Sequence, residues 1–377
     1  MTTFENDCTI ALPSCCSMLV TLICITHTHT EPRLRSWTLE FMSQLNSSYW
    51  EPGQLFGDNE TQMCSQGEAN LHKHLNGCTK NPGHTYFRPI DKFTIKDLPQ
   101  NHRDNDLFNF VKAAADLTVR VDVPMISPYR PEHWPNTKIP YPFFKDKGKK
   151  LLRTGSGEIN VHKYKNGVKL IWLLDLSKER MYNQAIKCPC RKCQLSEHPN
   201  TVWYEVLVTT ARHVVFDDIE ARETSLRLFY DKQDSPVVRL DGVSIFSANT
   251  EFDSAILQCA TCDVSIGEKL FRLKEKHLRF RNKVIEIYAL RSNDDFNFLV
   301  SHPHGCTKQV SFGQWKNYYK MRLDDRERDL RKLTYTTSTC PGSSGARVYS
   351  LGYCDHVHSG TLLSGLNYSS TGCYHIL

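Results

Sequence analysis

The chain has 377 residues, enough for two or more hydrophobic cores, and its hydrophobic and charged fractions, 40% and 23%, are ordinary for a globular protein. Its net charge of +6, from 47 basic against 41 acidic residues, is spread along the chain without a basic arm, so nucleic-acid binding is not indicated. The 15 cysteines are odd in number, and their clustering at short spacing favours metal binding or a reducing compartment, hence the cytoplasm slightly over secretion.

The N-terminal region, residues 1–100, shows no sustained helix or strand period and is expected to be irregular or disordered. Its apolar run from Met18 to Ile25 is too short to span a bilayer. Because Glu5 and Asp7 precede that run and no lysine or arginine does, the segment is also a poor signal peptide. No membrane span is therefore predicted.

Residues 101–150 are expected to form one short helix followed by a linker. The helix is predicted from Asp106 to Asp116, with Asn105 or Asp106 as its cap. The stretch from Pro124 to Pro142 carries six prolines, which exclude regular structure across it. This stretch is predicted to be a linker, or an extended strap over the domain that follows.

From residue 151 to 377 the chain breaks into many short β-rich runs, each bounded by Gly, Asp, Asn or Pro. This pattern of short runs separated by turn residues predicts an all-β barrel or sandwich. The charged segment from Glu268 to Arg281 is more helical and falls where two barrels would be joined. The two halves are therefore expected at about 151–265 and 282–377.

The most specific motif is Gly342-Ser343-Ser344-Gly345, which has the Gly-X-Ser-Gly form of a serine nucleophile on a tight turn. Glycine lets the backbone adopt a conformation that points the N–H groups of Gly342 and Ser344 at one spot. There they would stabilise the oxyanion of a tetrahedral intermediate. Taken alone, such a motif is more often a simple hairpin turn.

Two further motifs supply a base and an acid. His213 follows a predicted strand, whose end would hold a general base rigidly. Asp253 stands immediately before the apolar run Ala-Ile-Leu, where it can orient an imidazole and stabilise its cation. Alone, each is more simply a partly buried histidine or a strand-start aspartate. The competing aspartates, which lack that strand context, are Asp217, Asp218 and Asp263.

In their order His, Asp, Ser, the three motifs resemble those of the trypsin-like, chymotrypsin-fold serine peptidases. Thr154-Gly-Ser-Gly157 resembles the opening of the first barrel in HtrA-type and glutamyl endopeptidases, and Ser301-His-Pro-His-Gly305 resembles a turn of their second barrel. The resemblance covers residues 153–377 and implies two six-stranded antiparallel β-barrels, preceded by the irregular extension. It also implies a His213, Asp253 and Ser344 triad, a protein or peptide substrate, and no cofactor for catalysis.

The sequence departs from the family pattern next to the nucleophile. Ser343 stands where Asp or Asn is usual, and Cys340 and Pro341 lead into the loop. No Ile-Val-Gly-Gly sequence begins the domain, so the resemblance is to the branch that matures without a buried N-terminal ion pair. His358 stands where glutamyl endopeptidases place a histidine, which implies a preference for Glu or Gln. The positions that the resemblance assigns to substrate binding are Ser338, His358, Ser359 and Gly360.

Two cysteine clusters flank the strands next to His213 and Asp253. They comprise Cys188, Cys190 and Cys193 in the first and Cys259 and Cys262 in the second. If neighbouring strands bring them together, they form a structural Cys₄ zinc site. Two disulfides, or unpaired core cysteines, are alternatives of similar weight. Weaker metal candidates are the groups Cys64, His72, His74, Cys78 and His84, and His302, His304 and Cys306.

The three motifs together predict a serine endopeptidase that works through an acyl-enzyme intermediate. The alternative is a catalytically inactive binding protein that keeps the protease fold, because fold does not guarantee function. The unusual loop before the nucleophile leaves room for this alternative. Retention of all three catalytic residue types favours the enzyme.

Overall fold

The computed structural model describes residues 55–65, 67–68, 71–170, 186–288, 291, 294–323, 329–350 and 356–373. The apolar run from Met18 to Ile25 lies outside these ranges. Within them the chain is mostly β-sheet with few helices. No helix in these ranges combines the length and the apolar character needed to cross a membrane.

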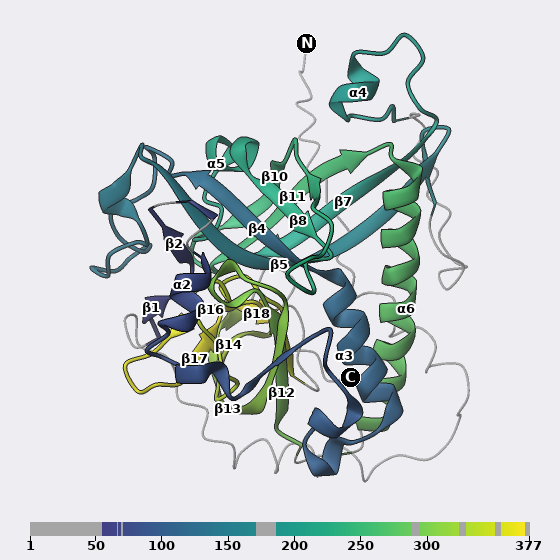
Figure 1. Cartoon of the computed structure of the whole chain (residues 1–377). Helices are drawn as coiled ribbons and strands as arrows, with labels where there is room; N and C mark the ends of the chain where they lie inside the picture. The colour runs from purple at the N-terminus through teal and green to yellow at the C-terminus, as the bar shows by residue number, and fades with distance from the viewer. Residues whose placement is uncertain are drawn as a thin grey trace, which may run out of the picture. The chain divides into compact units, whose positions relative to one another are not determined.

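The first sheet has nine antiparallel strands (Figure 1). Its order is β10 (Ser244–Asn249), β11 (Ser254–Thr261), β7 (Val202–Thr210), β5 (Lys150–Lys165), β4 (Thr118–Met125), β8 (Ser225–Leu228) and β9 (Val238–Leu240), with β2 (Gln62–Cys64) and β6 (Val168–Leu170) paired to β5. β9 and β10 stand at opposite ends of this order, although only residues 241–243 separate them. Every second residue of the central strands faces a shared core, as Val121, Val206 and Leu257 do.

The second sheet also has nine strands. Its order is β1 (Asp58–Asn59), β16 (His358–Thr361), β17 (Asn367–Ser369), β14 (Asp329–Tyr335), β13 (Gln309–Leu323), β12 (Phe296–Ser301) and β15 (Val348–Ser350), with β18 (Gly372–Cys373) on β14 and β3 (Phe87–Pro89) on β13. An isolated bridge between Arg347 and Val357 pairs the residues next to β15 with those next to β16. Leu299, Leu333 and Val348 share the core of this sheet.

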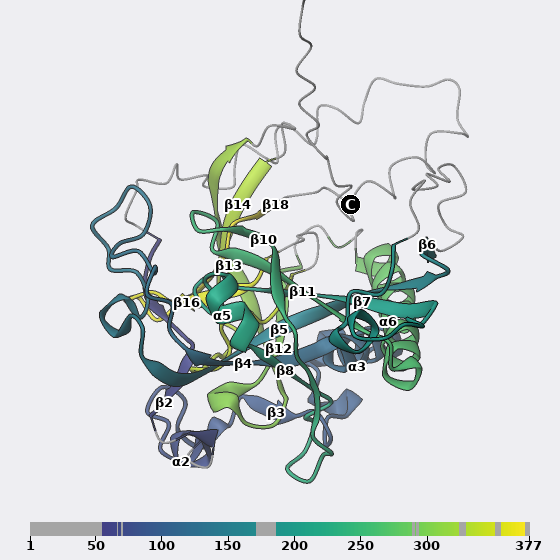
Figure 2. The same ribbon diagram turned by 90° about the horizontal axis from the view of Figure 1, so that it is seen from above.

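The helices are α2 (Leu71–Asn76), α3 (Asn105–Leu117), α4 (Arg191–Gln194), α5 (Asp218–Glu223) and α6 (Val264–Tyr288), with single 3₁₀ turns at Pro82–His84, Ile95–Asp97, Gln100–His102, Phe144–Asp146 and Pro303–Gly305. Asp104 caps α3, where Asn105 or Asp106 was expected, because its side chain accepts a hydrogen bond from the Leu107 N–H at 2.7 Å. α3 and α6 lie side by side in both views (Figure 1; Figure 2).

Residues before 151 also belong to the sheets, outside the range expected for the β-rich domain. β4 is a central strand paired with both β5 and β8, so the first sheet takes in residues well before 151. In the region expected to be irregular, β1, β2 and β3 join the two sheets. Strands of two or three residues are too short to show a period of two, so only tertiary pairing reveals them.

The proline-rich stretch packs against the loop that follows β7. Arg130 in this stretch donates two hydrogen bonds to Glu220, at 2.7 and 2.8 Å, and Arg153 pairs with the same carboxylate at 3.0 Å. Arg130 also donates to the carbonyl oxygen of His213 at 3.0 Å. All three charged side chains are buried. Burial opposes the charge of Glu220, but the two guanidinium groups outweigh it and lower the pKa of Glu220 to about 2.

Candidate active site

His213 and Asp253 are brought together by two neighbouring strands. β7 ends shortly before His213 and β11 begins directly after Asp253, and the two strands are antiparallel, with Thr210 opposite Ala255. The Nδ1 atom of His213 lies 3.0 and 2.8 Å from the two carboxylate oxygens of Asp253. Burial opposes the charge of Asp253, but the charge and hydrogen bonds of His213 outweigh it and lower the pKa of that carboxyl.

Ser344 reaches the same point from the second sheet, in the loop before β15. Its Oγ atom lies 2.8 Å from Nε2 of His213, and Asp253 also accepts a hydrogen bond from Ser359 at 2.7 Å. The three expected catalytic side chains therefore form one hydrogen-bonded series, which can move the serine proton to the imidazole. The competing aspartates accept hydrogen bonds from groups other than His213; these are Asp217, Asp218 and Asp263.

The loop around Ser344 holds two backbone N–H groups toward one oxygen atom. Gly342 and Gly345 have φ angles of 99° and 85°, and a Cβ on Gly342 would lie 2.3 Å from the carbonyl oxygen of His302. The N–H groups of Gly342 and Ser344 donate to the carbonyl oxygen of Glu60 at 2.6 and 3.2 Å. Two donors that converge on one carbonyl oxygen have the geometry of an oxyanion hole. The unusual residues before Ser344 leave this geometry in place.

The carbonyl oxygen bound by these two N–H groups belongs to residues 58–60, here called the N-terminal segment, which lies along β16. β1 pairs antiparallel with β16, with Asp58 opposite Thr361 and Asn59 opposite Gly360. Figure 1 shows the purple β1 beside the yellow β16, although they lie far apart in sequence. The next residue, Glu60, donates its N–H to Ser344 Oγ at 3.0 Å.

The side chain of Glu60 is buried against two basic groups. His358 Nε2 lies 2.5 Å from one carboxylate oxygen, and Lys80 pairs with the other. Tyr335 holds the far side of the imidazole, with its hydroxyl 2.6 Å from His358 Nδ1. Burial opposes the charge of Glu60, but His358 and Lys80 outweigh it and lower the pKa of Glu60 to about 2.

The four positions assigned to substrate binding make different contacts, and only one of them touches the Glu60 carboxylate. His358 contacts it directly, Gly360 pairs with the segment backbone, and Ser359 serves Asp253 instead. Ser338 is half-buried, and its carbonyl oxygen accepts a hydrogen bond from Ser311. Sequence reasoning missed Lys80 and Glu60 because no local pattern links them to His358, which lies 298 residues from Glu60.

Four of the five cysteines predicted to bind zinc lie close together, and the fifth does not. Cys188, Cys190 and Cys193 have their sulfur atoms within 4.8 Å of one another, and Cys262 Sγ lies 3.5 Å from Cys190 Sγ. Cys259 is buried in the core of the first sheet instead, apart from the cluster that contains the other cysteines. Cys259 and Cys262 are three residues apart across the end of β11, where the chain turns away from the core.

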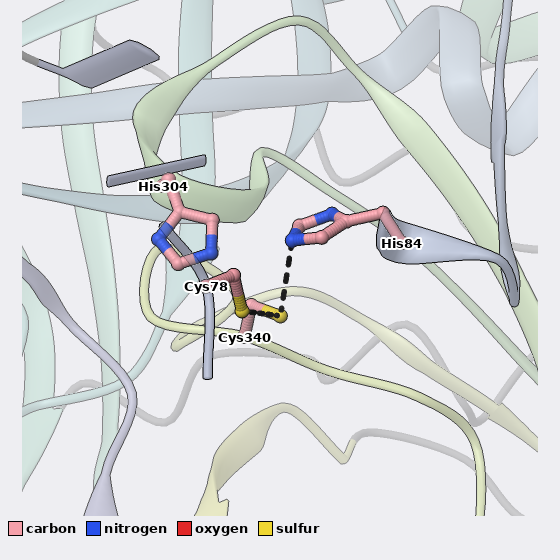
Figure 3. Close-up of side chains that lie close together, drawn as sticks. All are labelled: Cys78, His84, His304 and Cys340. Carbon is pink, nitrogen blue, oxygen red and sulfur yellow. Dashed lines mark hydrogen bonds between the residues drawn. The ribbon is translucent and has the colours of Figure 1, made fainter. Parts of the chain in front are cut away.

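A second group of metal-ligating side chains lies beside the loop of residues 340–345, here called the oxyanion loop (Figure 3). Cys78, His84, His304 and Cys340 have donor atoms within 4.8 Å of one another. The two sulfurs are 3.6 Å apart, and His84 Nε2 lies 3.8 Å from Cys340 Sγ. Burial lowers the pKa of His304 to about 4, so its imidazole is neutral at pH 7 and able to ligate. The weaker candidates that stay outside this set are Cys64, His72, His74, His302 and Cys306.

No protein-family model matches the chain, and no curated protein matches it in sequence. Similar solved structures include the HtrA-type protease AlgW with tripeptide, which is 13% identical, has a TM-score of 0.33, and is matched over 70% of this chain and 58% of that one. The match thus spans less than two thirds of the length of AlgW. Another is the inactive form of the Rv3671c protease of M. tuberculosis, 12% identical with a TM-score of 0.32, over 71% of this chain and 90% of that one.

Proposed function

We propose that the chain is a serine endopeptidase whose triad is His213, Asp253 and Ser344. The observation that carries the proposal is that a serine paired with a histidine and a pair of backbone N–H donors both contact one residue, Glu60. His213 Nε2 lies 2.8 Å from Ser344 Oγ, and the oxyanion hole beside that hydroxyl holds a carbonyl oxygen. Acyl transfer requires a nucleophile, a base for it, and hydrogen-bond donors that bind the carbonyl oxygen under attack.

In this mechanism Ser344 Oγ attacks a substrate carbonyl carbon while His213 Nε2 takes the hydroxyl proton. The N–H groups of Gly342 and Ser344 hold the oxyanion that forms. The carbon–nitrogen bond then breaks as His213 returns the proton to the leaving amine. Water hydrolyses the ester with His213 again as base, while Asp253 stays ionised and holds the imidazole.

The preferred substrate has glutamate before the cleaved bond. The supporting observation is the buried carboxylate of Glu60, which His358 and Lys80 bind beside the nucleophile. Glutamine fits the same pocket by shape but lacks the charge that complements Lys80. Peptides with glutamate at this position are therefore the expected substrates, and large aromatic or basic residues are disfavoured.

The two sheets correspond, in this proposal, to the two six-stranded barrels of a chymotrypsin-like fold. In the first, β9 and β10 act as one bent strand that returns the sheet to β8, which leaves β4, β5, β7, β8, β9–β10 and β11. In the second, the bridge between Arg347 and Val357 links β15 to β16. The triad lies where loops of the two sheets meet.

We also propose a structural zinc ion at the cluster of Cys188, Cys190, Cys193 and Cys262. The sulfur spacing supports it, and four thiolates are a usual closed zinc site. The ion has no part in the peptidase chemistry. Metal analysis of protein purified with and without thiol blocking tests this, and two disulfides in place of metal contradict it.

A fluorophosphonate, which reacts with activated serines, tests the proposed activity. Because Glu60 covers Ser344, the test uses full-length Glu60→Lys, which places a cation against Lys80 and His358 and displaces the segment. We expect rapid labelling of this variant, complete loss in Glu60→Lys/Ser344→Ala, and no change in Glu60→Lys/Ser247→Ala, since Ser247 is exposed on β10. Absence of labelling in folded Glu60→Lys refutes the peptidase and favours the inactive binding protein.

A further inference from the structure

We propose that the chain cleaves itself between Glu60 and Thr61, an inference that rests on the proposed peptidase activity. The Glu60 carbonyl oxygen accepts hydrogen bonds from both N–H groups of the oxyanion hole. The Glu60 N–H donates to the nucleophile Ser344, and the Glu60 carboxylate fills the pocket of His358. One residue, Glu60, therefore contacts the nucleophile through its N–H, the oxyanion hole through its carbonyl oxygen and the specificity pocket through its carboxylate.

The chain is held on the N-terminal side of this bond as a substrate strand is held. β1 pairs with β16, and a Cβ on Gly360 would lie 2.1 Å from the carbonyl oxygen of Asp58. That close approach requires glycine at position 360. A segment that only rested on the surface would leave room for a side chain there.

The chain is also held on the C-terminal side. β2 pairs with β5, with Gln62 opposite Thr154, and the side-chain oxygen of Gln62 lies 2.8 Å from His304 Nδ1. Thr61, between the two anchored stretches, is buried. Because both sides of the bond are fixed by the same chain, the reaction is intramolecular and gains the rate advantage of a pre-positioned substrate.

The step balances without any partner except water. Ser344 Oγ bonds to the Glu60 carbonyl carbon, and its proton passes to His213. The bond from that carbon to the Thr61 nitrogen breaks, and His213 gives the proton to the new amine of Thr61. Water then cleaves the ester, which restores Ser344 and leaves a carboxylate on Glu60.

Cleavage also opens the site. The strand β2 stays in the first sheet through its pairing with β5. After cleavage the chain no longer joins β1 and Glu60 to β2, and non-covalent contacts hold them, among them the pairing with β16, the side-chain pocket and the hydrogen bonds between Gly57 and Tyr368. Their departure exposes Ser344, which is fully buried while the segment is in place. Self-cleavage therefore precedes cleavage of any other substrate.

The test follows full-length protein by intact mass and N-terminal sequencing. We expect a product that begins at Thr61 in the wild type and none in Ser344→Ala. Glu60→Gln slows the reaction at least about tenfold, because a buried charged contact is lost. Glu132→Gln, an exposed change on the proline-rich stretch, leaves the rate unchanged. The half-life is independent of dilution, and tagged Ser344→Ala stays intact when mixed with active chain.

The outcomes separate this inference from the peptidase itself. If the wild type stays whole while Glu60→Lys is labelled at Ser344, self-cleavage is refuted and the peptidase stands, with the segment as its inhibitor. If neither reaction occurs, both proposals fail. Cleavage of tagged Ser344→Ala by active chain refutes the intramolecular route.

A different observation carries a second inference: the structure assigns a Zn²⁺ site to Cys78, His84, His304 and Cys340. Two thiolates at about 2.3 Å from one tetrahedral zinc lie about 3.8 Å apart. The observed separation of the two sulfurs is 3.6 Å. This is far longer than a disulfide bond and matches a shared ion.

The histidines of this group present free nitrogen atoms to it. Within the described part of the chain, His304 Nε2 is buried and has no hydrogen-bond partner, while its Nδ1 is held by Gln62. A second ring contact that fixes the imidazole is the usual arrangement around a zinc ligand. The four ligands come from three separate segments of the chain (Figure 3). A bound ion would therefore link the oxyanion loop, through Cys340, to the turn that carries His304.

Zinc content tests the site in full-length Ser344→Ala, which cannot cleave itself. His84→Ala changes a half-buried side chain on a turn, and we expect it to lose one zinc per chain. His74→Ala, an exposed neighbour, loses none, and Cys188→Ser, in the other cluster, retains this ion. Unchanged zinc in both His84→Ala and Cys78→Ser, or a Cys78–Cys340 disulfide in the purified protein, overturns the inference.

Discussion

His213 is held by contacts at both nitrogens of its ring and at its backbone. Nδ1 contacts the Asp253 carboxylate, Nε2 contacts Ser344, and the backbone N–H donates to Asp253 at 3.0 Å. The backbone carbonyl accepts from Arg130. The two ring contacts set the orientation of the imidazole. Because the Asp253 carboxylate can only accept, the neutral ring has its proton on Nδ1 and the lone pair of Nε2 toward Ser344. In the proposed mechanism, His213 therefore needs no rearrangement before it accepts a proton.

Gly342 is predicted to be irreplaceable. Gly342→Ala places a Cβ 2.3 Å from the His302 carbonyl oxygen at a φ of 99°, so the loop must move and its N–H turns away from the oxyanion. We expect kcat to fall by a factor on the order of 10²–10³, as when one oxyanion donor is removed. Peptide hydrolysis by the variant measures this.

Gly365→Ala is the matched control. It also has a positive φ, 83°, but nothing lies within 4 Å of its added Cβ. We expect a loss of about 1–2 kcal/mol in the free energy of unfolding from backbone strain, and unchanged kcat. Equal loss of kcat in both variants would show that backbone strain, rather than the oxyanion geometry, limits the reaction.

At the scale of elements, β7 and β11 act as a frame for the base and its acid. Their pairing runs without a bulge from Thr210 opposite Ala255 to Tyr204 opposite Thr261. A regular ladder fixes the residues that follow one strand and precede the other to within a small distance. α6 supports this frame from outside, because Gly267 lies against the ring of Tyr204 on β7.

Gly267→Ala tests that support. The added Cβ would lie 2.0 Å from Tyr204 Cδ2, and Tyr204 is fully buried with its hydroxyl bonded to Glu268 at 2.7 Å. The ring has no space to retreat, so overpacking of about 1–3 kcal/mol is expected to exceed the helix propensity gained. Urea unfolding should show a lower midpoint. Ser265→Ala, exposed on the same helix, should change stability by less than about 0.5 kcal/mol.

At the scale of the whole molecule, neither sheet holds a complete site. The first sheet supplies His213 and Asp253, the second supplies Ser344 and His358, and the N-terminal segment fills the gap between them. The proposed activity therefore depends on the docking of the sheets as well as on each side chain. The buried ion pairs of Glu220 tie the proline-rich stretch into the same assembly.

Acid stability tests this buried cluster. The pKa of Glu220 is about 2 in the folded protein against 4.5 as the ordinary value, so its charge stabilises the fold fully above pH 4.5. That stabilisation, at most about 3 kcal/mol, is lost as the pH falls from 4.5 toward 2. We expect the difference in unfolding free energy between Ser344→Ala and Ser344→Ala/Glu220→Gln to be largest at pH 7 and to shrink by pH 3. The matched change at exposed Glu223 should give a difference that does not vary with pH.

The sequence by itself determined the candidate residues of the proposed triad and the turn that carries Ser344. Glycine at 342 and 345 and the apolar runs beside His213 and Asp253 act through near neighbours, so a local pattern reveals them. It also indicated a β-rich domain from residue 151. The earlier strand β4 did not stand out in the sequence, because it ends within the run of prolines that begins at Pro124.

Only the tertiary structure decided what fills the site. Glu60 meets His358 across 298 residues through the pairing of β1 with β16, two strands too short to show a pattern of their own. Cys78 meets Cys340 across 262 residues, and both lie outside the strands. It likewise separated Cys259 from the cysteines grouped with it, since β11 turns its side chain into the core. Such contacts depend on how distant surfaces pack, and packing is a property of the folded chain that no short stretch of sequence contains.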